Sequence, residues 1–397
     1  MLSSIKQAGK DLLRRAGWRL IAYSEGEPGN SSWARVNSVE ELRLASLAYA
    51  KSMRLREGGS FSGYRYCSTS KKPVLYATIA ALLLKHLLDA IDEDCTEELE
   101  YLTCFQNDDG LFRDPVISCP QADQEDWWGW RHMTMLALMA LALYRKPAPR
   151  SLKSLEPLFN ENAFRRYLDS WDWGVRAAWT SNTLQNVGVM MQYARDYQGV
   201  TSAARTLEIL FDYLDEKQDP ATGLFGDKFE SAEELSNGVQ AGYHFWLLNF
   251  YDGRPIRHVE SIIDSVLRTQ SLSGGFGVKW NSSACEDIDS IDPLVRLTRL
   301  TSHKADAVQA AFQRALPALV RNANSDGGWV FRRDEAMTYG FSEHMYSAAN
   351  QSNLFFTWFR MLNHALLLEG MTDNRDHKMK SRWDTAPGLQ FLHSHAI

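Results

Sequence analysis

A short motif centred on glycine recurs along this 397-residue chain at a nearly constant spacing. The clearest copies combine an amide or acidic residue, one or two glycines and an aromatic side chain, and they occupy residues 106–112, 218–226, 270–277 and 324–329. Weaker copies occupy residues 58–61 and 171–174. The period is roughly 50 residues, which is typical of repeat architectures whose units bury their apolar faces only against one another. We therefore expect one repetitive domain rather than the several domains that the length would suggest.

Two kinds of helical pattern alternate between these motifs. Segments that are apolar on all sides, and are expected to be buried, occupy residues 75–84, 133–143, 187–197, 243–250, 293–300 and 354–368. Amphipathic segments occupy residues 38–51, 96–105, 203–216, 256–269 and 304–322. An outer helix, a glycine loop and an inner helix, repeated about six times, predict an all-α fold, an α/α toroid of helical hairpins around a central funnel.

The toroid is expected to span residues 38–370, with a lead-in at residues 1–37 and a C-terminal tail at residues 371–397. In each loop, glycine permits a turn with positive φ, and the following aromatic side chain is expected to pack between helices. The Gln or Asn of the motif would bond free carbonyl groups at helix ends. These features predict a structural role for the motif itself.

Composition narrows the class of protein. The net charge of −6 argues against a nucleic-acid partner, and no apolar run approaches the length of a membrane-spanning helix. Residues 1–15 form a basic amphipathic pattern that would either touch a membrane surface or pack on the outside of the toroid. The five scattered cysteines indicate a reduced, cytoplasmic protein without a disulfide framework. Thirteen Trp residues predict an aromatic-lined cavity or a core rich in aromatic side chains.

An acidic segment follows the third clear copy of the motif. It places four carboxylates within seven residues: Glu286, Asp287, Asp289 and Asp292. We expect the segment to open an inner helix, with Pro293 in the first turn and Asp287 or Asp289 as the N-cap. Because a cap needs only one carboxylate, the acidic side chains are expected to face the funnel. Crowded carboxylates cannot all ionise, so one of them would keep its proton near neutral pH.

The glycine loops resemble the repeats of the terpene cyclase and protein prenyltransferase superfamily over roughly residues 50–365. Residues 287–290 are similar to the Asp-x-Asp-Asp signature of class II terpene cyclases, although Ser290 replaces the last Asp. Such cyclases usually carry a second helical domain, for which this chain has no room. The resemblance implies that Asp289 is the proton donor, tuned by Asp287 and Glu286, with Asp292 as a further catalytic candidate.

The same resemblance raises the question of metal ions. Protein prenyltransferase β subunits imply a zinc site formed here by Cys285, Asp287 and His344. The order of Cys and Asp is reversed relative to that family, and no α-subunit partner is visible. The sequence therefore requires no cofactor, and zinc is a secondary interpretation.

Magnesium is expected only if the substrate carries a diphosphate. Asp108 and Asp109 do not extend into an Asp-Asp-x-x-Asp motif, which disfavours chemistry that ionises a diphosphate. For a diphosphate substrate, Arg332, Arg333 and Lys279 at loop tips would hold the phosphate groups, although solvation of the surface also explains them.

Other polar and aromatic residues are predicted to lie at the same end of the funnel as the acidic segment. The substrate-binding candidates are Asp126, Trp127, Trp128, Trp130, Arg131, His132, Trp179, Asn182, Gln240, Tyr243, His244, His344 and Asn350. Amides bond sugar hydroxyls and Trp faces stack on sugar rings, so this set also fits a glycan.

A glycan-active enzyme could use these residues in two ways. A polysaccharide lyase would use Tyr243 or His244 for proton transfer, with Asn182 and Arg131 neutralising a uronate. An inverting glycosidase would pair Asp126 with Asp289, because it needs two carboxylates on opposite sides of the bond.

Three functions follow, from different classes. The first is a class II-type terpene cyclase-like enzyme that protonates an isoprenoid through Asp289, with the cation held among aromatic rings. Those rings would be Trp127, Trp128, Trp130, Trp179 and Tyr243. The alternative is a glycan-active hydrolase or lyase in the same funnel. The third is a non-catalytic or partner-dependent subunit related to prenyltransferases.

Overall fold

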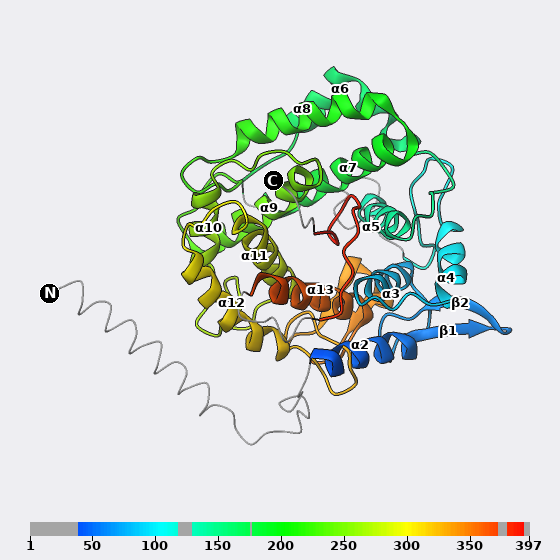
Figure 1. The fold of residues 1–397 in the computed structure, drawn as a ribbon. Coiled ribbons are helices and arrows are strands. Elements are labelled where there is room, and N and C mark those ends of the chain that lie inside the picture. Colours follow the sequence, from blue (N-terminus) through cyan, green and yellow to red (C-terminus); the bar gives the residue numbers. More distant parts are fainter. Residues whose placement is uncertain (1–38, 118–128, 175–176, 372–378, 393–397) are drawn as a thin grey trace.

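The computed structural model describes residues 39–117, 129–174, 177–371 and 379–392. Within them, an inner ring of helices surrounds the centre of the molecule (Figure 1). The ring consists of α3 (Leu75–Leu87), α5 (Trp130–Leu143), α7 (Ala177–Gln198), α9 (Ala232–Tyr251), α11 (Ala284–Leu297) and α13 (Leu354–Gly370). Each inner helix packs against the next, and α13 packs against α3, which closes the ring.

An outer layer of amphipathic helices surrounds this ring. It consists of α2 (Val39–Met53), α4 (Asp94–Thr103), α6 (Glu161–Asp169), α8 (Thr201–Lys217), α10 (Val259–Arg268) and α12 (Ala305–Val320). One outer helix precedes each inner helix along the chain, so the predicted α/α toroid of helical hairpins is confirmed. Helix α6 and the preceding short helix η2 (Lys153–Phe159) were not predicted. No described helix is both long and apolar enough to cross a membrane.

Three inner helices begin earlier than the apolar pattern suggested. Helices α7, α9 and α11 start at Ala177, Ala232 and Ala284, well before the predicted segments at residues 187, 243 and 293. Their first turns carry polar side chains, which interrupt the apolar pattern although the backbone is already helical. Pro293 therefore lies inside α11 and not in its first turn, contrary to the prediction.

Short strands occur at two places in the described chain. Strands β1 (Arg54–Glu57) and β2 (Ser60–Tyr64) form an antiparallel hairpin, whose turn contains Gly58 and Gly59. The weak motif at residues 58–61 is therefore a hairpin turn and not a repeat loop. Strands β3 (Met337–Thr338) and β4 (Tyr346–Ser347) pair around the short helices η3 (Tyr339–Phe341) and η4 (Glu343–Met345).

The repeat loops share one hydrogen-bond pattern with the inner helices that follow them. The backbone N–H of the loop aromatic donates to a side-chain oxygen in the next inner helix. The pairs are Phe112 with Thr134 at 2.8 Å, Phe276 with Asp287 at 3.0 Å and Trp329 with Thr357 at 3.0 Å. All three aromatic side chains are buried, as predicted. Asp287 therefore occupies a position that Thr fills in two other repeats.

The recurrence of an amide a few residues before a glycine in the copies of the motif also has a physical basis. The Gln106, Gln218 and Gln270 amides donate to the carbonyl of their own loop glycine, at 2.8–2.9 Å. Gln270 also donates to the carbonyl of Ala311 in the next outer helix, at 2.8 Å. Gly274 has φ +98°, and a Cβ there would clash with the carbonyl oxygen of Arg314. Each loop thus joins its repeat to the following one.

The predicted tail contributes to the centre of the ring. The described part of it, residues 379–392, crosses the interior, where it is drawn in red in Figure 1. Ala386, Leu389, Gln390 and Phe391 are buried there. The amphipathic pattern at residues 1–15 lies outside the described residues.

Candidate functional site

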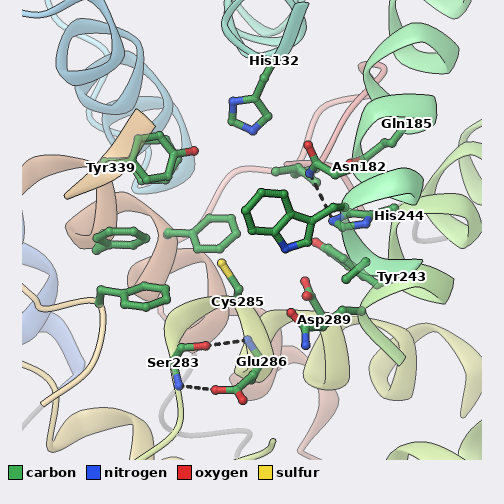
Figure 2. Close-up of a pocket in the computed structure, with 18 of the residues that line it drawn as sticks. His132, Asn182, Gln185, Tyr243, His244, Ser283, Cys285, Glu286, Asp289 and Tyr339 are labelled. Carbon is green, nitrogen blue, oxygen red and sulfur yellow. Dashed lines mark hydrogen bonds between the residues drawn. The ribbon is translucent and has the colours of Figure 1, made fainter. Parts of the chain in front are cut away.

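A cavity of about 350 Å³ lies at the centre of the toroid. Helices α5, α7, α11 and α13 contribute residues from their first turns, and α9 contributes residues from its middle (Figure 2). Phe331, Arg332, Met337, Tyr339 and Leu389 complete the lining. Polar side chains from the starts of α5, α7 and α11 thus lie together at this cavity, whereas α13 contributes aromatic ones.

One wall of the cavity is polar and is built by α7 and α9. The amide nitrogen of Asn182 lies 3.3 Å from Nε2 of His244, and Nδ1 of His244 lies 2.8 Å from the Ser181 hydroxyl. The Gln185 amide nitrogen and the Tyr243 hydroxyl are buried and have no hydrogen-bond partner of good geometry among the described residues, although the Tyr243 hydroxyl lies close enough to Asp292 to oppose the rise in pKa that burial causes at that carboxyl. Because buried polar groups are normally paired, these two atoms can accept a ligand as partner.

The two histidines of the cavity are neutral. Burial lowers the pKa of His132 to about 3, and burial together with His132 lowers that of His244 to about 3. The Tyr76 hydroxyl lies 3.0 Å from Nδ1 of His132. Both imidazoles therefore serve as hydrogen-bonding groups near neutral pH and not as cations.

The opposite wall is aromatic. Its rings are Phe331, Tyr339, Phe355, Phe356 and Phe359. The ring centroids of Tyr339 and Phe355 are 4.3 Å apart, and those of Phe331 and Phe356 are 4.7 Å apart. None of these rings was among the predicted site residues. Three of them open the segment 354–368, so applying the rule used for the other inner helices would have found them.

The acidic segment forms the first turns of α11 beside both walls. Ser283 is the N-cap, and its hydroxyl accepts the backbone N–H of Glu286, at 3.1 Å. One Glu286 carboxylate oxygen accepts the backbone N–H of Ser283 and a guanidinium N–H of Arg332, both at 2.8 Å. The predicted caps, Asp287 and Asp289, do not fill this role, because the capping box of Ser283 and Glu286 already does.

Asp289 points into the cavity from the same helix (Figure 2). Its side chain is buried, and no described residue forms a hydrogen bond or ion pair with it. Burial, followed by the charges of Glu286, Asp292 and Asp287, raises the pKa of Asp289 well above its ordinary value. The shift extends the pH range over which the protonated acid persists, in the direction expected for crowded carboxylates.

The other two acidic residues do not line the cavity, contrary to the prediction. Asp287 forms a buried ion pair with Arg360 and accepts the Ser282 hydroxyl at 2.8 Å. Asp292 accepts Nε of Arg296 at 2.5 Å, one turn along the same helix. The helical rotation explains the position of Asp287, which points about 100° away from Glu286, whereas Glu286 and Asp289 share a face. Asp292 lies close to that face but one turn further along the helix, beyond the residues that line the cavity.

The remaining candidates divide into three groups. His132, Trp179, Asn182, Gln240, Tyr243 and His244 line the cavity. Among the residues described as lining it, Trp130, Arg131, His344 and Asn350 do not appear. Arg131 instead lies 3.4 Å from the Tyr167 hydroxyl, and Asn350 donates to Asp334 at 2.9 Å. Asp126, Trp127 and Trp128 lie outside the described residues.

The structure does not bring the predicted metal ligands together. Cys285 lines the cavity, Asp287 faces Arg360, and His344 lies on η4 beside Glu343. In the described part of the chain, no three His, Cys, Asp or Glu side chains are placed to hold a metal ion.

The predicted phosphate-binding cations all have partners within the protein. Arg332 lines the cavity and donates Nη2 to Glu286, whereas its Nε and Nη1 atoms are buried without a hydrogen-bond partner. Lys279 pairs with Glu335 at 2.9 Å. The Arg333 guanidinium donates to the backbone carbonyl of Arg321, at 2.6 Å.

Comparison with known proteins gives a likeness to solved structures only. No family model matches the sequence, and no curated protein matches it either. Among solved structures, the GH76A α-1,6-mannanase from Salegentibacter sp. HEL1_6 is similar, with a TM-score of 0.46 and 11% identity. The match covers 84% of this chain and 99% of the mannanase chain. The identity is too low for residue roles to be transferred.

Proposed function

We propose that this protein is a glycan-active enzyme, a glycoside hydrolase in which Asp289 is the general acid. One observation carries the proposal: a buried carboxyl without a partner faces a cavity whose adjoining wall consists of amides, imidazoles and a phenol. This places the alternative predicted from the sequence ahead of the terpene cyclase hypothesis.

A sugar ring matches both walls. Its hydroxyl groups would supply the partners that the Gln185 amide nitrogen and the Tyr243 hydroxyl lack. Its C–H face would pack against the aromatic wall defined above. Trp179, which is 37% exposed at the cavity, provides a further ring for stacking.

The chemistry requires a proton donor and a second carboxylate. Asp289 would give its proton to the glycosidic oxygen as the bond from the anomeric carbon to that oxygen breaks. A water molecule would then attack the anomeric carbon and lose its proton to a base. Glu286 is the second cavity carboxylate, one helical turn from Asp289, and Arg332 and the N–H of Ser283 fix its orientation.

A hydrolase explains the cavity better than a lyase does. Burial and the charges of Asp292 and Asp289 raise the pKa of Tyr243 well above its usual value, so the hydroxyl stays protonated and little tyrosinate is present to act as a base. A lyase also needs a cation to neutralise the uronate carboxylate. Arg332 lines the cavity but is already paired with Glu286.

An isoprenoid cyclase is the second candidate function. The observation that favours it is the proximity of a protonated Asp289 to the aromatic wall, whose ring faces would stabilise a carbocation. A hydrocarbon, however, would leave the polar atoms of Gln185 and Tyr243 without partners.

The test exposes the purified protein to neutral and acidic oligosaccharides and, separately, to prenyl diphosphates, with products identified by mass spectrometry. We expect hydrolysis of an oligosaccharide, and a loss of about 10²–10⁴-fold in rate for Asp289→Asn. Asp212→Asn, at an exposed carboxylate on α8, is the matched control and should keep the full rate. Cyclised products from a prenyl diphosphate, without glycan cleavage, would overturn the proposal.

A further inference from the structure

We infer that residues 386–391 form a fixed floor that makes the cavity a blind pocket, so that the enzyme acts on the ends of glycan chains. This inference rests on the proposed function and narrows its substrate class. Within this floor segment, Leu389 is the residue that lines the cavity and sets its depth.

The floor segment is held by buried side-chain hydrogen bonds. The Gln390 side chain is fully buried, accepts Nε1 of Trp358 at 2.5 Å and donates to the carbonyl of Leu83 at 3.0 Å. The carbonyl of Phe391 accepts Nη2 of Arg296, at 2.5 Å. These bonds attach the segment to α13, α3 and α11, so it is part of the packed interior.

The contacts also show which end of the ring the segment closes. Most of its partners, together with that of the adjoining Thr385, lie in the second halves of successive inner helices. These are Leu83 of α3, Met139 of α5, Tyr197 of α7, Tyr251 of α9 and Arg296 of α11. Trp358, near the start of α13, is the exception, and its indole N–H reaches the Gln390 side chain. The cavity residues of α5, α7, α11 and α13 come from the first turns instead. The segment therefore closes the end of the ring opposite to these first turns.

The floor is tied to the helix that carries the proposed acid. Arg296 bonds both Asp292 and the carbonyl of Phe391, and its guanidinium lies 4.5 Å from the centre of the Phe391 ring. Asp292 thus has a positioning role, since it orients the arginine that fixes the floor beneath Asp289.

A blind pocket restricts the way in which a polymer can bind. An internal unit of a glycan needs space for chain on both sides, whereas a terminal unit needs it on one side only. At about 350 Å³, the cavity is at the lower end of the range of roughly 300–1,000 Å³ for ligand sites. The described floor leaves no path for a chain to continue past Leu389.

The experiment follows the products released from oligosaccharides labelled at the reducing end, using the full-length protein. We expect release of terminal units only. Leu389→Ala deepens the pocket and should improve the rate on substrates with a larger terminal unit, relative to the original substrate, by about tenfold. Leu392→Ala, just beyond the floor segment, should leave this preference unchanged.

Hydrogen exchange provides a readout that needs no glycan. The backbone amides of Leu389 and Gln390, which donate to the Met139 sulfur, should be protected from exchange like those of the inner helices if the floor is fixed. Cleavage at internal bonds would overturn the inference while leaving the proposed function intact. If no glycan is cleaved, the proposed function fails, and fast exchange in the floor segment would then overturn the closed floor as well.

Discussion

Helix α11 holds its buried carboxylates in two opposite ways. Asp287 and Asp292, which do not line the cavity, are buried in ion pairs with Arg360 and Arg296. Asp289, which lines the cavity, is equally buried but has no partner among the described residues. The comparison teaches that proximity in sequence does not give carboxylates one function: paired carboxylates hold the ring together, and the unpaired one is available for proton transfer.

The largest expected effect concerns the paired carboxylate Asp287. Arg360→Met removes the partner of Asp287 and leaves its charge buried, which should lower the free energy of unfolding by about 3–5 kcal/mol. Chemical denaturation measures this loss. Arg205→Met, which breaks the exposed pair with Glu161, is the matched control and should leave stability nearly unchanged, because solvent screens that pair. Equal losses in both variants would show that the Asp287–Arg360 pair does not support the ring.

The next effect concerns the unpaired carboxylate Asp289 and appears as a pH dependence of the free energy of unfolding. The folded state holds the pKa of Asp289 well above its unfolded value of about 3.9. The contribution of this group to stability is therefore fully present below about pH 4 and is lost as the pH rises through the folded pKa, with a slope of at most about 1.4 kcal/mol per pH unit.

Asp289→Asn removes this titration, so the variant should gain stability relative to the wild type as the pH is raised from 4. Denaturation curves of both proteins across the pH range measure the difference. Asp212→Asn, at an exposed position, should run parallel to the wild type. Parallel curves for Asp289→Asn as well would mean that the folded protein does not hold this proton.

The smallest effect separates capping from chemistry. Ser283→Ala removes the N-cap of α11 and should cost about 1 kcal/mol, as should Ser231→Ala at the equivalent capping box of α9. Ser283→Ala also loosens the orientation of Glu286 and should lower the rate on a glycan substrate, whereas Ser231→Ala should not. If Ser283→Ala and Ser231→Ala lose activity equally, the cap of α11 has no role in orienting Glu286 for the reaction.

The toroid itself could be predicted because its signals are local. The alternation of apolar and amphipathic segments and the spacing of glycine loops recur in each unit, so each repeat strengthens the prediction made from the others. Helix starts were predicted less well, because polar residues such as Asn182 and Gln185 interrupt the apolar pattern inside α7. Those same residues form the polar wall of the cavity.

The site could be predicted only in part. The conclusion that one carboxyl of the acidic segment would keep its proton needed only the crowding of charges along the chain, and Asp289 fits it. The partners of Asp287 and Asp292 were not predictable in this way. Arg360 reaches Asp287 across 73 residues of sequence, and the spacing within the segment contains no information about it.

The sequence by itself therefore determined the repeat, the all-α toroid and the crowding of acidic residues on one inner helix, because each depends on neighbours along the chain. Only the tertiary structure decided which carboxylates are paired, which rings form the aromatic wall and that residues 386–391 close the ring. The physical reason is ring closure. It brings α13 against α3 and residues 385–391 against all six inner helices, and these contacts between distant segments set the burial and charge environment of the cavity.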